Sequence, residues 1–311
     1  FRTRGFHGCL IAIFAGAVAA GRLLDLEAAP MAQAIALSAT SIGGLATAAN
    51  TSVAREYHAG LAAMLGIHAA LAAQRGFQAE ERILETPHGF FEVYGGVEPT
   101  NAEASVTRDL GQSWDIVTDM AIKLVPGGHP HHALAEAAAN AARDGRIAPD
   151  EVESITLSRP GVTTLAGPRH PTDLIGMAHS PAYFLAAGVA DQDFSWVHAT
   201  QAKITDPVIH RLIDRIRVGA PPTDNAACYR QGAMVTIRTT DGRTSMSTVY
   251  APKGAGIGGI AWADIDAKYR ALVPHSGLHN REIEASLSVI HDFRQVKNVS
   301  ALTNLLKPQE A

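Results

Sequence analysis

The segment 58-HAGLAAMLGIHAALAAQRG-76 predicts a helix with small residues on every face. Gly76 is typical of the residue that follows the last turn of such a helix. Helices rich in alanine and glycine can approach one another closely, so the segment indicates a tightly packed helical bundle. The same kind of pattern predicts further helices of this bundle at residues 9–24, 30–48 and 79–85.

The pattern changes near Trp114, where strands begin to alternate with helices. A hairpin is predicted where two alternating segments flank Asp241-Gly242, a strong two-residue turn signal. Asp206 and Pro207 are typical of an N-cap and the first helical position. The predicted elements are strands at 119–125, 152–159, 233–240 and 244–251, and helices at 131–145, 180–190, 206–218, 261–272, 279–293 and 298–306.

These elements predict a mostly α protein with an inserted α+β domain. Residues 1–115 form the first part of a helical domain, residues 116–257 form a smaller α+β lid domain, and residues 258–311 return to the helical domain. Both chain ends therefore contribute to one bundle, and the middle of the chain forms the second domain.

Composition narrows the classes of partner. The 311 residues carry a net charge of -4 with a pI near 6.4, so no basic surplus is available to neutralise nucleic acid phosphates. The longest apolar run, residues 8–21, is shorter than the ~20 residues that cross a bilayer. Cys9 and Cys228 lie far apart and form no C-x-x-C pair. We therefore expect a cytoplasmic protein that binds neither nucleic acid nor membrane.

Common cofactor and metal motifs are weak or missing in the sequence. The segment 254-GAGIGGI-260 lacks the G-x-G-x-x-G fingerprint and follows a hairpin rather than a parallel βαβ unit. Pro130 splits the trio His129, His131 and His132, and the first carboxylate after them is Glu136. The sequence therefore predicts neither a bound cofactor nor a metal.

Cationic or titratable residues stand at the start of three apolar helices. His7 precedes the helix at 9–24, Arg55, Tyr57 and His58 open the next small-residue helix, and Lys123 precedes a Pro-Gly-Gly break before the helix at 131–145. Helix N-termini favour anions such as carboxylates, and arginine binds a carboxylate through two N–H groups. The recurring arrangement indicates a site for a small carboxylic acid.

The residues at these positions resemble the MmgE/PrpD family, which includes 2-methylcitrate dehydratases, cis-aconitate decarboxylases and iminodisuccinate epimerases. The resemblance covers essentially the whole chain in order and is carried by RGFH, the HAGLAA helix, I-K-x-x-P before an H-x-A-x-x-A helix, SPAY and ADIDAKY. It implies a helical domain interrupted by a lid domain, and a homodimer without metal or organic cofactor. Members have a further segment ahead of RGFH with an Asp and a His of the site, so this chain is expected to lack the family's N-terminal segment.

The resemblance implies that His7, His58, Lys123 and His132 are catalytic. Neighbouring residues are predicted to bind substrate: Arg55, Tyr57, Gly128 and His129. Arg55 stands where the family often has lysine, and arginine cannot shuttle protons because its pKa lies above ~12. Gly127 and Gly128 stand where members frequently carry cysteine or histidine, so substrate choice is expected to differ there.

The resemblance implies a cofactor-independent lyase, most similar to a 2-methylcitrate dehydratase, that acts on a small di- or tricarboxylic acid. A histidine would remove the proton α to a carboxylate, and a protonated His or Lys would assist departure of hydroxide. The alternatives are an isomerase or epimerase, a decarboxylase, and a non-catalytic protein that keeps only the carboxylate pocket.

Overall fold

The computed structural model describes residues 1–41, 44–52, 54–96, 106–114, 116, 120–224, 229 and 231–307. The chain divides into two compact units: Phe1–Thr118 with Asp173–His179, and Asp119–Thr172 with Ser180–Ala311. The first unit is helical, and the second contains a four-stranded mixed sheet with helices. The prediction of a mostly α protein with an α+β part is confirmed at this level.

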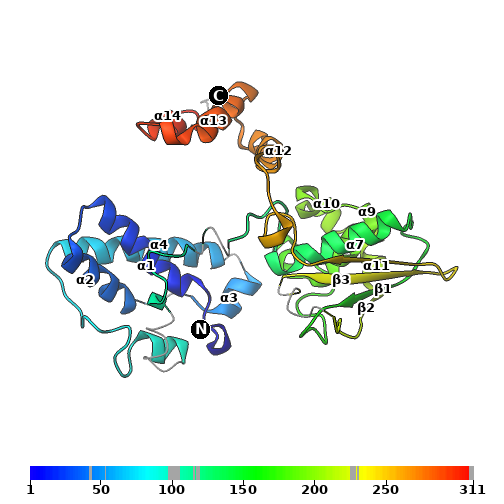
Figure 1. Ribbon diagram of the computed structural model, residues 1–311, viewed down its shortest axis with the longest axis horizontal. Helices are drawn as coiled ribbons and strands as arrows, with labels where there is room; N and C mark the ends of the chain where they lie inside the picture. The colour runs from blue at the N-terminus through cyan, green and yellow to red at the C-terminus, as the bar shows by residue number, and fades with distance from the viewer. Residues whose placement is uncertain are drawn as a thin grey trace. The chain divides into compact units, whose positions relative to one another are not determined.

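The first unit is built on three long helices that pack against one another, α1, α2 and α4 (Figure 1). The α-helices with assigned bounds among its described residues are α1 Cys9–Leu23, α2 Ala28–Ala39, α3 Ala46–Thr51, α4 Ala54–Gln74 and α8 Leu174–Ala178. Small residues fill the contact between α2 and α4, where Ala34 and Ala70 are fully buried. The predicted packing of alanine-rich helices is therefore confirmed for this unit.

Glycine sets the distance between α1 and α4. A Cβ atom added to Gly66 would lie 2.4 Å from the carbonyl oxygen of Ile13 and 2.7 Å from the amide nitrogen of Ala17. On the facing helix, a Cβ atom at Gly16 would lie 3.1 Å from the carbonyl oxygen of Ala63. The two backbones thus meet at a separation that a larger residue at Gly66 would prevent.

Two helix predictions in the first unit are wrong. The segment 30–48 is two helices, because α2 ends near Thr40, whose hydroxyl donates to the Leu37 carbonyl at 2.7 Å, and Leu45 is extended and bridges to Phe6. Residues 81–85 form turns rather than a helix. Pro87 follows closely and disfavours a helical conformation in the residue before it.

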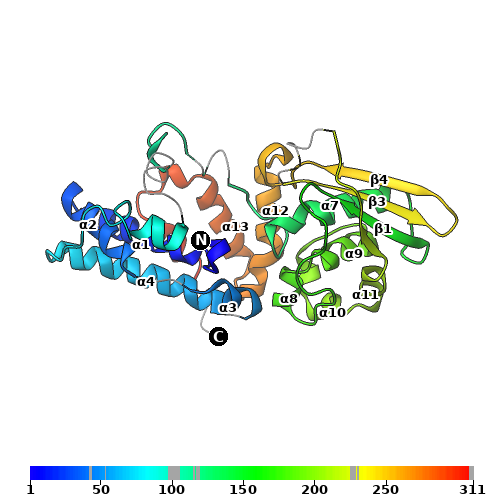
Figure 2. The same cartoon turned by 90° about the horizontal axis from the view of Figure 1, so that it is seen from below.

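The second unit contains a sheet with strand order β2-β1-β3-β4. Its strands are β1 Val152–Ser158, β2 Ile216–Val218, β3 Ala233–Thr239 and β4 Thr244–Val249. β1 runs parallel to β2 and antiparallel to β3, and the predicted hairpin of β3 and β4 is confirmed. The helix α7, His132–Asp144, packs on β3 and β4 and against α9, Pro181–Asp191 (Figure 2). The residues of α9 are nearly all buried.

The segment 206–218 folds differently from the predicted single helix. Asp206 is an N-cap as expected, because its carboxylate accepts the amide N–H of Val208 at 2.8 Å. The helix α11 covers Pro207–Ile213, and the chain then continues as β2, where Ile216 pairs with Ile155. The predicted strand at 119–125 is also wrong over its described residues, which have no regular secondary structure. Ile122 makes one backbone hydrogen bond, to Gly254 at 2.9 Å.

Further α-helices in the described part of the second unit are α10 Gln201–Ile204, α12 Trp262–Leu272, α13 Asn280–His291 and α14 Ser300–Thr303. Arg270 on α12 and Glu284 on α13 form an ion pair at 2.7 Å. The assignment of residues 258–311 to the same domain as residues 1–115 stays a prediction. Among the described residues, every helix is too short or too polar to cross a membrane.

Candidate functional site

His7 lies just ahead of α1, beside the thiol of Cys9. Its Nδ1 atom is 3.1 Å from Cys9 Sγ and accepts the backbone N–H of Cys9 at 3.4 Å. Burial raises the pKa of the Cys9 thiol, and the positive charge of Arg55 opposes that effect. The thiol therefore keeps its proton near neutrality and can donate it to Nδ1, which leaves Nε2 to carry the ring proton of neutral His7.

Gly44 connects His7 to His58. The backbone N–H of His7 donates to the Gly44 carbonyl at 3.1 Å. The His58 ring packs on the same glycine so closely that an added Cβ atom would lie 1.9 Å from His58 Nδ1. His7, just ahead of α1, and His58 on α4 are thus brought to one residue, as the sequence alone could not show.

The Nδ1 atom of His58 is buried and has no hydrogen-bond partner among the residues that the structure describes. Buried polar atoms are almost always paired, and an exception calls for an explanation such as a catalytic role, strain, or a bound water or ion. This nitrogen is therefore a candidate for proton exchange or ligand binding in the first unit.

Arg55 and Tyr57 flank this cluster at the start of α4. The Arg55 side chain is 39% exposed and lies 3.6 Å from Glu56, and its charge acts on Cys9. Tyr57 is 69% exposed, with its ring centroid 6.3 Å from that of His58. We use the name His7 cluster for His7, Cys9, Gly44, Arg55 and His58, and Tyr57 lies at its solvent side.

In the second unit, Lys123 closes the loop that leads to α7. Its ammonium group donates to the Gly127 carbonyl at 3.0 Å, and its own carbonyl accepts from Lys268 at 2.5 Å. Gly127 has φ near +84°, a conformation that favours glycine. Gly127 is therefore required by the loop conformation, and Gly128 follows it in extended conformation as the residue before a short 3-10 helix, His129–His131.

His132 is a buried residue that holds this loop. It is 4% exposed, its Nε2–H donates to the Pro126 carbonyl at 3.2 Å, and its ring stacks on Phe184. Burial, followed by the charges of His129 and Lys123, lowers the pKa of His132 to about 4. The ring is neutral at pH 7 and is not a proton donor to substrate from Nε2 in this arrangement.

His129 lies beside His132, with ring centroids 5.2 Å apart. Burial, then the charges of Lys123 and Arg159, lower the pKa of His129 as well. The structure thus brings Lys123, Gly128, His129 and His132 together around one loop. The other four predicted residues, His7, Arg55, Tyr57 and His58, gather at the start of α1 and α4.

The depressed pKa of His132 predicts a loss of stability in acid. In the unfolded chain this imidazole titrates near its ordinary value of ~6.5, whereas in the folded chain it titrates near 4, so protons bind the unfolded state preferentially between these values. The free energy of unfolding is expected to fall by about 2 kcal/mol between pH 7 and pH 5 from this group. Urea unfolding at both pH values measures it.

The control is His132→Gln, which removes the titrating ring. The variant is expected to lose less stability than the wild type over the same pH range, by about the same 2 kcal/mol. Equal pH dependence in both proteins would show that His132 is not the responsible group.

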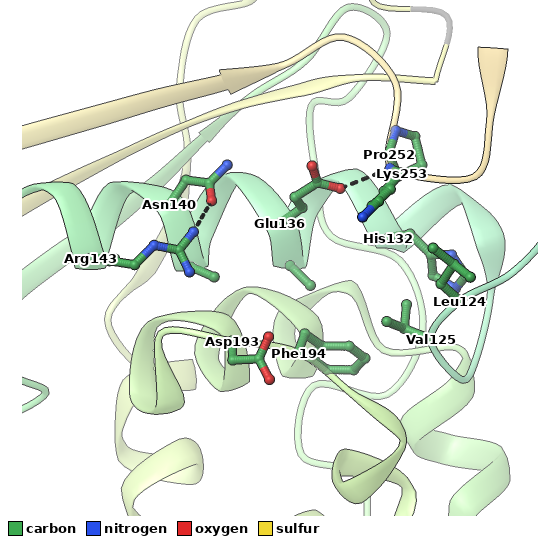
Figure 3. Close-up of a pocket in the computed structure, with 12 residues that line it drawn as sticks. Leu124, Val125, His132, Glu136, Asn140, Arg143, Asp193, Phe194, Pro252 and Lys253 are labelled. Carbon is green, nitrogen blue, oxygen red and sulfur yellow. Dashed lines mark hydrogen bonds between the residues drawn. The ribbon is translucent and has the colours of Figure 1, made fainter. Parts of the chain in front are cut away.

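A pocket of about 450 Å³ opens beside α7 in the second unit. Figure 3 shows Glu136, Asn140 and Arg143 projecting from α7 toward it, with Asp193 and Phe194 on the facing segment. The lining residues are Leu124, Val125, His132, Ala135, Glu136, Ala139, Asn140, Arg143, Asp193, Phe194, Pro252 and Lys253. Of the residues predicted to form the site, His132 is the one in this lining. The sequence analysis missed Glu136, Asn140 and Arg143, whose spacing along one face of a predicted helix is the signal that could have identified them.

The charged groups of the pocket balance one another. Glu136 accepts the backbone N–H of Lys253 at 3.0 Å, and Arg143 donates to the Gln192 carbonyl at 3.2 Å and to Asn140. Asp193 adds a second carboxylate. Glu136 and Asp193 against Arg143 and Lys253 give no excess of positive charge, so this pocket does not favour a polycarboxylate.

Among the described residues, no three His, Cys, Asp or Glu side chains gather as a metal-binding group. That the predicted catalytic residues act without a metal stays a prediction.

Comparisons with known proteins identify two domains in the chain. The MmgE/PrpD N-terminal domain matches residues 1–103, and the MmgE/PrpD C-terminal domain matches residues 126–291. The expectation that the chain lacks the family's N-terminal part is therefore wrong at the level of domains. The first match contains His7, Arg55, Tyr57 and His58, the second contains Gly128, His129 and His132, and Lys123 lies between them.

Two curated relatives carry the same name. The chain is 24% identical to the human cis-aconitate decarboxylase over 305 residues, which cover 96% of this chain and 62% of that protein. It is 31% identical to the cis-aconitate decarboxylase of Aspergillus terreus over 121 residues, which cover 37% of this chain and 25% of that protein. The chain thus spans less than two thirds of the length of these relatives.

Proposed function

The chain belongs to the MmgE/PrpD family, and on that premise we propose that it is a cofactor-independent lyase acting on a small di- or tricarboxylic acid. The His7 cluster is the observation that carries the proposal. It places two imidazoles and a guanidinium at the starts of two helices, with one imidazole nitrogen buried and unpaired among the described residues. These are the groups that carboxylate binding and proton transfer require.

The first reaction we propose is loss of CO2 from a substrate such as cis-aconitate, because the curated relatives are decarboxylases of that acid. The C–C bond to one carboxylate breaks, CO2 leaves, and the electron pair stays on carbon in conjugation with a second carboxylate. Arg55 would hold that carboxylate and stabilise the developing charge. An imidazolium of His7 or His58 would then protonate the carbon, so the net reaction consumes one proton.

Dehydration of a 2-methylcitrate-like acid is the second candidate. It needs a base for the α proton and an acid for the departing hydroxide, whereas decarboxylation needs a single proton donor. The convergence of His7 and His58 on Gly44 supplies two titratable groups and supports this reaction. A homodimer and a cytoplasmic location stay predictions.

Turnover of two acids in deuterated buffer distinguishes these reactions. We expect the purified chain to release CO2 from cis-aconitate with one deuterium incorporated, as followed by NMR and CO2 detection. Alkene formation from 2-methylcitrate without CO2 release would support dehydration instead, and deuterium exchange without either product would indicate an isomerase.

Variants then test the assignment of residues. His7→Ala and Arg55→Ala are each expected to lower kcat/KM by at least ~10-fold, because the proposed reaction uses the imidazole as proton donor and the guanidinium to hold a carboxylate. If both retain turnover within that factor, the site assignment is wrong. If tricarboxylic acids raise Tm while none of them is turned over, the chain is a binding protein and the lyase proposal fails.

A further inference from the structure

A small apolar cavity in the second unit is lined by residues of β1, α7 and α9. Its volume is about 140 Å³, and it shares no described lining residue with the pocket beside α7. Leu134, Leu157 and Pro181 are buried and contribute one residue from each of the three elements. Val162 and Leu165 add two more aliphatic side chains from the segment that follows β1. The cavity can therefore accept an alkyl group.

Arg159 brings a positive charge to this lining. It directly follows β1 and stands two positions after Leu157, and residues two apart on a strand lie on the same face, which explains why both reach the cavity. Its Nη1 group donates to the Pro130 carbonyl at 2.8 Å. Arg159 is the one charged side chain among the lining residues that the structure describes, and none of these is a carboxylate. The cavity thus combines aliphatic side chains with one cation.

The surroundings of the Arg159 guanidinium favour an anion. Burial lowers the pKa of Arg159, because protein atoms displace part of the water that would solvate its charge. A bound carboxylate would replace that lost hydration with charge-assisted hydrogen bonds. A guanidinium carries five N–H groups, so it can donate to a backbone carbonyl and to a ligand carboxylate together.

We propose that this cavity binds a short-chain aliphatic monocarboxylate, with the carboxylate on Arg159 and the alkyl chain against Leu134, Leu157 and Val162. A cavity of ~150 Å³ can hold benzene, and butyrate has the same number of non-hydrogen atoms. A second carboxylate, or a phosphate, would place charged oxygens against aliphatic side chains, which is costly. The site therefore differs from the His7 cluster in the acids it selects, and it does not depend on the proposed lyase reaction.

Occupation of the cavity should be detectable at His129. After burial and the charge of Lys123, the positive charge of Arg159 is the third cause of the lowered pKa of His129. A carboxylate bound at Arg159 would offset that third contribution, so the pKa of His129 should rise when butyrate is bound. NMR titration of the His129 ring with and without butyrate measures the change.

Isothermal titration calorimetry of the full chain with butyrate tests the proposal directly. We expect one site with a Kd of ~1 mM or tighter. Butyramide, which has the same size and no charge, should bind at least ~10-fold more weakly. Acetate should bind about 15-fold more weakly than butyrate, because two fewer methylene groups are buried. Succinate and inorganic phosphate should not displace butyrate.

Variants separate this site from others on the chain. Arg159→Gln should weaken butyrate binding by at least ~10-fold. Arg217→Gln is the matched control, because Arg217 is an exposed arginine on β2 outside the lining, and it should bind butyrate as the wild type does. Ala166→Phe should block binding by filling the cavity while Arg159 is retained. His7→Ala should leave butyrate binding unchanged, so failure of this proposal is distinguishable from failure of the lyase proposal.

Methyl NMR of the unaltered chain covers the case in which a variant does not fold. Butyrate should shift the methyl signals of Leu134, Leu157 and Val162 and leave those of Leu10, which is buried in the first unit, in place. The proposal is overturned if none of the three cavity residues responds, if butyramide binds as tightly as butyrate, or if folded Arg159→Gln binds butyrate as the wild type does.

Discussion

Replacing His58 by alanine is expected to lower kcat/KM by about 10²–10⁴-fold, the range typical of a lost general acid or base. The Nδ1 atom of this ring is buried and unpaired among the described residues, and the ring rests directly on Gly44, which also accepts the backbone N–H of His7. A group held in this way can transfer a proton to or from a bound acid. Steady-state kinetics with the substrate identified in deuterated buffer measure the loss.

The matched control is His68→Ala, which removes an exposed imidazole from the same helix, α4. It should leave kcat/KM unchanged. Added imidazole should partly restore turnover to His58→Ala, which a purely structural role would not allow. Retention of activity within tenfold in a folded His58→Ala protein would rule out the proposed role.

The local parts of the fold could be predicted from the sequence. The helices α1, α4, α7 and α9 follow from long runs of small and apolar residues, and the hairpin of β3 and β4 follows from Asp241-Gly242. Asp206 is an N-cap because its short carboxylate reaches the second amide of the helix, a signal contained in a few adjacent residues. Each of these predictions depends on short-range chemistry.

Predictions that depended on distant partners were less successful. Ile216–Val218 continued an apolar helical pattern, but its pairing with Ile155–Leu157 makes it a strand, and periodicity alone does not separate these states over three residues. The segment before Lys123 has the composition of a strand. Its described residues nevertheless form no ladder of backbone hydrogen bonds, and Ile122 donates a single one, to the Gly254 carbonyl.

The candidate site also divides into features visible in the sequence and features that depend on tertiary packing. Histidines at helix starts were visible in the sequence, whereas the meeting of His7 and His58 at Gly44 depends on how α1 and α4 pack. The burial that depresses the pKa of His132 also comes from tertiary structure, through Phe184 and the loop that contains Pro126. Residue type therefore indicated which groups could react, and packing determined which of them are placed to do so.

Replacing Gly66 by alanine is expected to destabilise the first unit by about 3 kcal/mol, at the upper end of the range for overpacking. The added methyl group would meet the backbone of α1 at Ile13 and Ala17, and backbone atoms cannot turn aside as a flexible side chain can. The helices must separate, and the buried alanines between them lose contact. Because His7 and His58 lie at the starts of these two helices, turnover should fall together with stability.

Gly60→Ala is the control on the same helix, since an added Cβ atom there meets no heavy atom within 4 Å. It should stabilise the unit by about 0.5–1 kcal/mol, because alanine has the higher helix propensity. Hydrogen exchange of the α1 and α4 amides in the full chain reports on this unit separately from the rest of the protein. If Gly66→Ala leaves that protection unchanged, the close approach of α1 and α4 does not exist in solution, and the geometry that joins His7 to His58 would have to be abandoned with it.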